Sequence, residues 1–286
     1  MHLYRSILYM PGANVRAMAK AKQLDCDAVI FDLEDAVSPE GKVNARTQVV
    51  ETVKAGGFGH RGLIVRVNGL DTPWGEQDIA ACGNLALDAM LFPKIESAKQ
   101  VHEIILHLER LSVRDLPIWL MVETPAGVLN LGDFAAHPRV QALVMGTSDL
   151  VTELRASHLP NRENIHYALQ HCLLVARSAG KLIFDGVHLD FRNEDSFSAV
   201  CHAGRAMGFD GKTLIHPTQI SQANQVFGYS EQAIALAHRL LEVWRAARAE
   251  GQGVAVLDGR LIENLHAAEA QRVVAFADAL ASRSPP

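Results

Sequence analysis

The chain lacks any concentration of positive charge. Its 286 residues include 27 lysines and arginines against 32 aspartates and glutamates, which gives a formal net charge of −5 at pH 7. No basic run or stripe breaks this mildly acidic pattern. Nucleic acids and anionic membranes attract proteins through basic surfaces, so the sequence argues against both as the main partner. The mild acidity does not argue against a phosphate-bearing small molecule as a ligand, because a few lysines or arginines close together would bind it.

Long apolar runs are also missing. No run approaches the ~20 residues that a membrane-spanning helix needs. The N-terminal segment reaches Pro11 and Gly12 too early to serve as a secretory signal. Hydrophobic residues nevertheless make up 49% of the chain, which is enough for a large core. We therefore expect a soluble, cytoplasmic protein without a membrane partner.

Cysteine and histidine motifs are scarce as well. The four cysteines lie far apart without a C-x-x-C pair, which indicates reduced core thiols. The 13 histidines form no H-E-x-x-H or H-x-H motif, which argues against zinc, and His216 is as consistent with a structural role as with any other. Pro11 and Gly12 do not begin a G-x-G-x-x-G fingerprint, which disfavours a dinucleotide-binding open sheet.

Eight apolar runs of strand length alternate with segments of helical periodicity. The runs are nearly continuous, as expected for strands that are covered on both faces. Eight strand–helix repeats predict an α/β fold, a (β/α)8 TIM barrel, with a doubly wound sheet as the alternative. The expected strands are 6–10, 28–31, 63–67, 89–92, 118–122, 142–145, 182–184 with Val187, and 213–215. The expected helices are 14–23, 43–55, 76–82, 98–111, 163–179, 196–207 and 219–226, with 127–136 left open.

The chain continues well past the eighth strand. We predict a catalytic barrel over residues 1–228 and a C-terminal helical arm or lid over residues 229–286. The arm would consist of a long helix (230–250), a glycine-punctuated extended stretch (251–259) and a final helix (261–280). It has to lie outside the barrel, reach over its mouth or dock onto another subunit. The candidate hinges are Gly251, Gly253 and Gly259.

Polar side chains gather at the C-terminal ends of the predicted strands, where barrel enzymes carry their chemistry. Glu123 and Asp149 are the strongest candidates, since each follows an apolar run on successive strands. Two carboxylates so placed repel each other unless a cation lies between them, and Mg²⁺ accepts one or two carboxylates plus substrate oxygens. Either residue alone is also consistent with a helix cap or a loop ion pair. Other polar residues at these ends are Asp32, Glu34, Asp35, Asn68, Lys94 and Glu96.

Arg66 lies inside an otherwise apolar strand, where an unpaired cation is unfavourable. Its partner is either a protein carboxylate, Glu34 or Asp35, or a substrate carboxylate or developing oxyanion. The two interpretations coexist if Asp35 orients Arg66. Lys94 is the lysine best placed to form a Schiff base, which needs an apolar pocket, but Glu96 two residues later argues against it.

Several motifs together carry a resemblance to a known family. They are RSILYMPG at 5–12, FDLEDAV at 31–37, RVN at 66–68, PKIES at 93–97, ETPAG at 123–127, DFR at 190–192 and the most specific one, AMGFDGKTLIHPTQ at 206–219. The chain resembles the citrate lyase beta-subunit-like family of the HpcH/HpaI aldolase superfamily. Its nearest members by these motifs are the malyl-CoA, citramalyl-CoA and citryl-CoA lyases.

The resemblance implies a Mg²⁺-dependent barrel enzyme that acts on a 3-hydroxyacyl-CoA. It makes Glu123 and Asp149 the metal ligands, with Glu123 also contacting the substrate. It makes Arg66 the group that binds the thioester or carboxylate oxygen. Arg5 is a weaker candidate for contact with the CoA phosphates, and other cations near the first helix are equally consistent with solvated surface charges.

In the family's lyases, an acidic residue on the C-terminal segment of a neighbouring subunit handles the proton on the acyl-CoA methyl group. The family pattern is approximately Gly-x-Met-Ile-Asp-x-Pro, whereas this chain reads GRLIENL at 259–265. Glu263 therefore stands where aspartate is usual, Leu265 replaces the proline, and Asp258 is the alternative acid. In addition, Ser148 replaces an acidic neighbour often seen beside the metal-binding aspartate.

The resemblance thus predicts a carbon–carbon lyase that cleaves malyl-, citramalyl- or citryl-CoA to an acyl-CoA and a 2-oxo acid by retro-Claisen chemistry. Arg66 would stabilise the enolate and Glu263 would protonate it. The alternatives are a metal-dependent aldolase acting on free 2-oxo acids and a non-catalytic subunit that binds an acyl-CoA. The C-terminal arm favours a homo-oligomer, with a trimer preferred.

Overall fold

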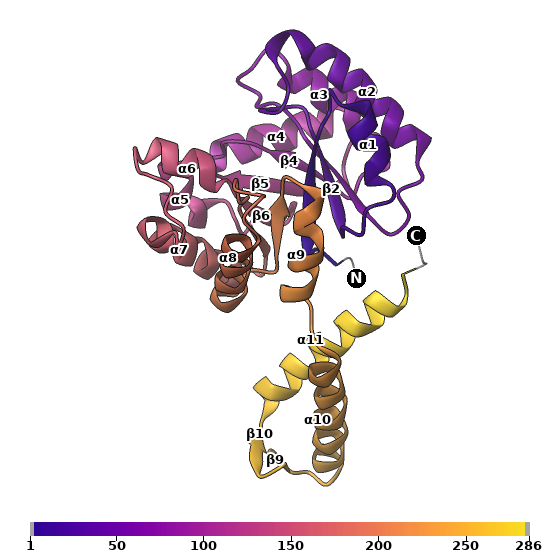
Figure 1. Ribbon diagram of the computed structural model, residues 1–286, viewed down its shortest axis with the longest axis vertical. Coiled ribbons are helices and arrows are strands. Elements are labelled where there is room, and N and C mark those ends of the chain that lie inside the picture. The colour runs from indigo at the N-terminus through magenta and orange to yellow at the C-terminus, as the bar shows by residue number, and fades with distance from the viewer. Residues whose placement is uncertain (1–2, 284–286) are drawn as a thin grey trace. The chain divides into compact units, whose positions relative to one another are not determined.

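Eight parallel strands pair in chain order and close into a barrel, with β1 bonded to both β2 and β8 (Figure 1). The computed structural model describes residues 3–283. The predicted (β/α)8 barrel is confirmed. The strands are β1 (Ser6–Pro11), β2 (Ala28–Asp32), β3 (Gly62–Arg66), β4 (Ala89–Phe92), β5 (Ile118–Val122), β6 (Val140–Met145), β7 (Leu182–Asp185) and β8 (Gly211–Leu214).

Helices surround the ring of strands (Figure 1). Every helix expected from the periodicity is present, with ends that differ by a few residues. One helix, α6, was not expected: it starts almost directly after β6 and carries Asp149 in its first turn. The helices of this part of the chain are α1 (Val15–Ala21), α2 (Lys42–Ala55), α3 (Gly75–Cys82), α4 (Ala98–Arg110), α5 (Pro125–Leu129), α6 (Thr147–Glu153), α7 (His166–Ser178), α8 (Glu194–Met207) and α9 (Ile220–Val226).

α4 shows why these segments form helices. The Ser97 side chain accepts a hydrogen bond from the backbone N–H of Gln100 and so caps the N-terminus. The buried residues then follow at helical spacing, which places them on one face against the strands. They are Val101, Ile104, Ile105 and Leu108.

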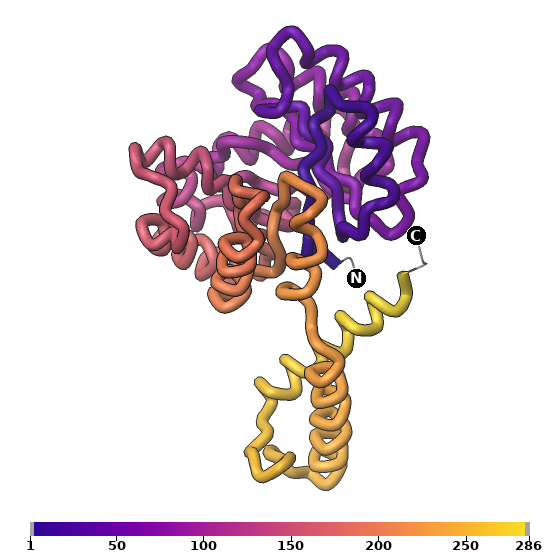
Figure 2. Tube along the Cα trace, viewed as in Figure 1, coloured from indigo at the N-terminus to yellow at the C-terminus, as the bar shows by residue number. Residues whose placement is uncertain are grey.

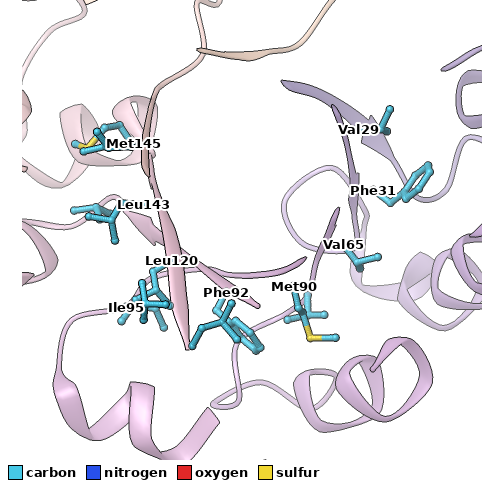
Figure 3. Close-up of a cluster of buried hydrophobic side chains, with 14 of the residues drawn as sticks. Val29, Phe31, Val65, Met90, Phe92, Ile95, Leu120, Leu143 and Met145 are labelled. Atoms are coloured by element: carbon cyan, nitrogen blue, oxygen red, sulfur yellow. The ribbon is translucent and has the colours of Figure 1, made fainter. Parts of the chain in front are cut away.

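Two apolar layers explain the continuous hydrophobic runs of the strands. Successive side chains of a strand point to opposite faces, so one set fills the barrel and the other packs under the helices. The inner set includes Ile30, Ile64, Met121 and Phe184. Figure 3 shows part of the outer set between the strands and the surrounding helices: Val29, Phe31, Val65, Met90, Phe92, Leu120 and Leu143.

The same alternation sends three polar residues into the mouth of the barrel. Asp32 lies two residues after the inward-facing Ile30, and Arg66 lies two residues after Ile64. Glu123 likewise lies two residues after Met121. The C-terminal end of the barrel is therefore lined by charged side chains, while its middle is apolar.

Residues 228–283 form a compact unit of their own, separate from the unit Tyr4–Phe227. It consists of α10 (Glu231–Ala249), β9 (Ala255–Leu257), β10 (Arg260–Ile262) and α11 (Asn264–Ala281), which Figure 2 traces from orange to yellow. Its own core joins the two helices to the strands through residues such as Leu241, Trp244, Ile262 and Val273.

The segment 251–259 differs from the expected extended stretch, because β9 and β10 form a tight antiparallel hairpin. Asp258 and Gly259 make its two-residue turn, with φ angles of 49° and 75°. Positive φ at both positions is what a type I′ hairpin turn requires. Gly251, with φ of 76°, ends α10. Two of the three candidate hinge glycines therefore have defined structural roles.

None of the helices within residues 3–283 combines the length and the apolar character needed to cross a membrane.

Candidate active site

A cavity of about 340 Å³ opens at the C-terminal end of the barrel. Residues from the ends of β1, β2, β3, β5, β6 and β8 line it, so its walls come from nearly the whole ring. Arg66, Glu123 and Asp149 all lie on this cavity. The structure thus brings together the three residues that the sequence singled out for metal and substrate binding.

Arg66 is held in place by Asp32. The Arg66 Nε donates to Asp32 Oδ1 over 2.7 Å, and Nη2 donates to Oδ2 over 2.6 Å. The two residues are partners in the β2–β3 register. The sequence suggested Glu34 or Asp35 instead. Both do contact Nη1, at 2.9 Å and 3.5 Å, but the two-pronged bond is made by Asp32.

Arg66 stays cationic in this buried setting. Burial opposes its charge, but Asp32 and the neighbouring acids outweigh this effect and raise the pKa of Arg66 above its ordinary value. The guanidinium carbon also lies 5.1 Å from the centre of the Tyr9 ring. The arginine is therefore a fixed positive charge beneath the cavity.

Glu123 is only 2% exposed. Its Oε1 accepts a hydrogen bond of 2.8 Å from the backbone N–H of Lys94. Burial raises the pKa of Glu123 to about 7, although Arg66 pulls in the opposite direction. A cation in the cavity would favour the ionised form of this carboxyl group.

Gly146 leaves room for the Glu123 side chain. A Cβ atom at position 146 would come within 2.4 Å of both Cβ and Oε2 of Glu123. Only glycine fits there, so the strand end of β6 is shaped around the carboxyl group. This explains why the residue that precedes α6 has no side chain.

Asp149 is more open than Glu123. Its side chain is 36% exposed, and its Oδ2 lies 3.7 Å from the Lys94 Nζ. The same ammonium lies 3.9 Å from Glu34 Oε1. Burial favours the neutral form of Lys94, but the surrounding carboxylates, Glu34 first among them, outweigh it and raise the Lys94 pKa. A Schiff-base lysine needs a lowered pKa, so this environment opposes that alternative.

The ligand set of the cavity fits magnesium. Within residues 3–283, no group of three or more His, Cys, Asp or Glu side chains is arranged to hold a metal ion. Glu123 and Asp149 line the cavity and offer two carboxylates, and an ion there would complete its shell with water or substrate oxygens. Mg²⁺ binds in this way, whereas zinc prefers sites that contain nitrogen or sulfur ligands.

Arg5 is not brought to this cavity. It precedes β1 and so lies at the N-terminal end of the barrel, whereas the cavity lies at the C-terminal end. Its Nε and Nη2 donate to the two carboxylate oxygens of Asp27 over 2.9 Å and 2.8 Å. This side chain is therefore paired within the protein, and its contact with CoA stays a prediction.

Glu263 and Asp258 belong to the C-terminal unit. Glu263 is exposed at the start of α11, and its backbone N–H donates to Nδ1 of His266 over 3.1 Å. Asp258 Oδ1 accepts from Nη2 of Arg239 over 2.9 Å. Their catalytic role stays a prediction.

Three comparisons relate the chain to known proteins. The family model described as HpcH/HpaI aldolase/citrate lyase matches residues 5–217. A (3S)-malyl-CoA thioesterase of Cereibacter sphaeroides is 46% identical over 281 residues, covering 98% of this chain and 97% of that protein. The citrate lyase beta subunit of Leuconostoc mesenteroides is 32% identical, covering 97% and 94%. The solved structure of CitE from Mycobacterium tuberculosis, in complex with magnesium, acetoacetate and coenzyme A, gives a TM-score of 0.74 at 27% identity, covering 96% of this chain and 97% of that one.

Proposed function

The chain belongs to the HpcH/HpaI aldolase/citrate lyase family, as its motifs predicted, and on this premise we propose that it is a Mg²⁺-dependent hydrolase of 3-hydroxyacyl-CoA thioesters of the malyl-CoA class. The main structural support for this proposal is the cavity at the C-terminal end of the barrel, which is lined by Arg66, Glu123 and Asp149. The substrate class and the reaction rest on the (3S)-malyl-CoA thioesterase, which is 46% identical over almost the whole chain.

Glu123 and Asp149 would hold the metal ion. The solved relative that contains magnesium supports the choice of ion, as does the carboxylate-only ligand set. When bound, Mg²⁺ supplies a positive charge that polarises a substrate oxygen. Glu123 gains most from it, because burial otherwise favours its neutral form.

Arg66 would bind the thioester or carboxylate oxygen of the substrate. An arginine has five N–H groups, and Asp32, Glu34 and Asp35 contact it at four oxygens. The contact to Asp35 is the longest, and the Asp35 side chain is 54% exposed. A substrate oxygen would therefore displace Asp35 first, while Asp32 keeps the guanidinium in place.

Hydrolysis also needs a base that takes a proton from the attacking water. We assign this role to Glu34, which lies 2.9 Å from the Arg66 Nη1. Burial raises the pKa of Glu34 to about 7, although Arg66 opposes this rise. A base whose pKa lies near the working pH is the most effective one.

The C-terminal sequence favours hydrolysis over carbon–carbon cleavage. Cleavage leaves an enolate whose carbon must be protonated, and the lyases use an aspartate followed two residues later by proline. This chain has Glu263 and Leu265 at those positions. Hydrolysis requires no proton on carbon, so it is unaffected by this departure.

Carbon–carbon cleavage, the reaction predicted from the sequence, remains the second candidate. The citrate lyase beta relative favours it. In that reaction Glu263 would protonate the enolate from a neighbouring subunit of a homo-oligomer, a trimer in our prediction. Mixing inactive Arg66→Ala subunits with inactive Glu263→Gln subunits would then restore activity, because some sites would combine an intact Arg66 with an intact Glu263. If each site lay within one subunit, mixing would leave the activity unchanged.

Product identification decides between the two reactions. With (3S)-malyl-CoA and Mg²⁺, hydrolysis gives malate and the free thiol of CoA. Cleavage gives acetyl-CoA and glyoxylate. Free thiol without glyoxylate supports the proposal, and glyoxylate formed at the rate of substrate loss overturns it in favour of the lyase. Absence of turnover with malyl-, citramalyl- and citryl-CoA would reject both and favour an acyl-CoA-binding subunit or an aldolase of free 2-oxo acids.

A further inference from the structure

Lys94 adopts a backbone conformation that lysine rarely takes. Its φ angle is 50°, in the left-handed region that favours glycine. Such a residue persists only where its surroundings hold it, and these positions cluster at functional sites. Here the Lys94 N–H donates to Glu123 Oε1 over 2.8 Å, and the Lys94 carbonyl accepts from Gln100 Nε2 over 3.4 Å. The backbone of Lys94 is therefore tied to a proposed metal ligand.

The side chain of Lys94 reaches the other proposed ligand. Its Nζ lies 3.7 Å from Asp149 Oδ2 and 3.9 Å from Glu34 Oε1. Both distances exceed the length of a direct hydrogen bond, so charge alone holds the ammonium there. The side chain is also 54% exposed, which leaves it a path into solvent. Arg66, in contrast, is fixed by two short bonds to Asp32.

We propose that Lys94 is a resident counter-cation, which offsets part of the charge of Asp149 and Glu34 in the metal-free protein and gives way when a divalent ion binds. The inference rests on the proposed metal site. A lysine ammonium and a metal ion that share Asp149 repel each other and compete for its oxygens. The charge at position 94 therefore lowers the metal affinity, and it reduces the excess of negative charge in the pocket before the ion arrives.

The expected effect is moderate, because exposed ion pairs contribute little. Pairs of this kind are worth roughly a factor of 1.4 to 5 in an equilibrium constant, and the lost repulsion between lysine and metal adds to this. Removing the charge should thus tighten metal binding by about two- to tenfold. High salt should narrow this difference, because it screens exposed charges.

Titration calorimetry with MgCl₂ on the full chain, without substrate, tests the inference. Lys94→Met, which keeps most of the side-chain length and removes the charge, should bind Mg²⁺ about two- to tenfold more tightly than the unmodified protein. Lys94→Arg keeps the charge and should stay near the unmodified value. The matched control is Lys99→Met, since the Lys99 ammonium lies 3.6 Å from Glu103 and is largely exposed. It should leave the affinity unchanged.

The calorimetric results distinguish failure of the Lys94 inference from failure of the metal site. Equal or weaker binding by Lys94→Met, in protein whose thermal unfolding shows it folded, overturns the inference and leaves the metal site standing. If Lys94→Met does not fold, Lys94→Gln gives the same comparison. Unmodified protein that binds neither Mg²⁺ nor Mn²⁺ would reject the metal site itself, and with it the inference.

Discussion

Two charged clusters in the barrel unit are built on opposite principles. The outer cluster has one acid and two cations: Asp185, Lys212 and Arg162. The mouth cluster has five acids and two cations: Asp32, Glu34, Asp35, Glu123 and Asp149 with Arg66 and Lys94. The single acid of the outer cluster thus has a cation at each of its two oxygens, whereas the mouth cluster has an excess of three acids.

The outer cluster is closed. Asp185 and Lys212 are both fully buried, and Lys212 Nζ lies 2.8 Å from Asp185 Oδ2, with Arg162 Nη1 2.6 Å from Oδ1. Burial acts against the ionised Asp185, but Lys212 and Arg162 outweigh it and lower the Asp185 pKa below its ordinary value. α8 also packs closely here, since a Cβ at Gly204 would lie 2.8 Å from the Asp185 carboxylate. Nothing further is needed to satisfy this acid.

In the mouth cluster, by contrast, the cations of the chain do not compensate all of the acids. Burial raises the pKa of Glu123 and of Glu34 to about 7, so their charges are not compensated by the chain alone. Strongly perturbed acids on a cavity mark functional sites more often than structural ones. An ion cluster whose acid is fully paired with cations thus stabilises the fold, whereas one with unmatched acids is prepared for a cation from outside.

Removal of the divalent ion should have the largest effect. We expect EDTA to lower the turnover of malyl-CoA at least ~1000-fold, because a charge-stabilising group worth several kcal/mol would be lost. Excess MgCl₂ should restore it. Turnover measured by thiol release before and after chelation checks this, and full activity in EDTA would remove the metal from the proposal.

Lys212→Met breaks the closed cluster. It leaves Asp185 buried with one cation fewer, and breaking a buried pair costs about 3–5 kcal/mol. We expect that loss in the free energy of unfolding from urea titration. The turnover number of the folded variant should change little, because Lys212 faces α8 rather than the cavity. A loss below about 1 kcal/mol would show that the cluster does not stabilise the fold.

Arg66→Ala tests the fixed cation of the mouth cluster. Losing one oriented donor to a developing charge costs about 3–4 kcal/mol, so kcat should fall roughly 100-fold or more. Arg66→Lys keeps the charge without the two-pronged bond to Asp32 and should recover only part of the rate. Steady-state kinetics with saturating substrate measure both variants, and near-normal kcat in Arg66→Ala would defeat the assignment.

Glu123→Gln tests the unmatched acid through its pH dependence. Its pKa rises from an ordinary 4.5 to about 7 in the folded protein, so the folded state binds its proton more tightly than the unfolded state does. This contribution to stability is present below about pH 4.5 and is lost as the pH rises to 7.

In metal-free protein, Glu123→Gln should therefore raise the free energy of unfolding by about 2–3 kcal/mol at pH 8 and by little at pH 4.5. Urea titrations at both pH values measure the difference. Asp149→Asn is the matched control, because its carboxylate is more exposed. The same gain at both pH values would show that the effect is not due to the charge of Glu123.

The barrel could be predicted because strands covered on both faces leave continuous apolar runs, which the sequence displays directly. The charged strand ends followed from the same pattern. The partner of Arg66 could not be predicted from this pattern. Asp32 lies opposite Arg66 only because of the register between β2 and β3, and that register is set by the closed barrel. The position of Arg5 relative to the cavity likewise depends on where its strand begins: β1 starts at Ser6, so Arg5 lies at the opposite end of the barrel.

The sequence also did not predict two short elements, α6 and the β9–β10 hairpin. α6 is one of the shortest helices and is rich in polar residues, so its periodicity is too weak to detect. The β9–β10 hairpin did carry a signal, since Asp258 and Gly259 are a strong pair for a two-residue turn between strands. The glycines around it suggested flexibility, whereas the turn uses Gly259 for its left-handed backbone.

The left-handed backbone at Lys94 has a practical consequence for anyone who engineers this protein. Glycine takes up that conformation without strain, so Lys94→Gly would relax the chain by about 1 kcal/mol. A screen that rewards heat resistance alone would select it. The selected variant would unfold at a higher temperature. Its affinity for Mg²⁺ would also change, and a screen for heat resistance would not detect that change.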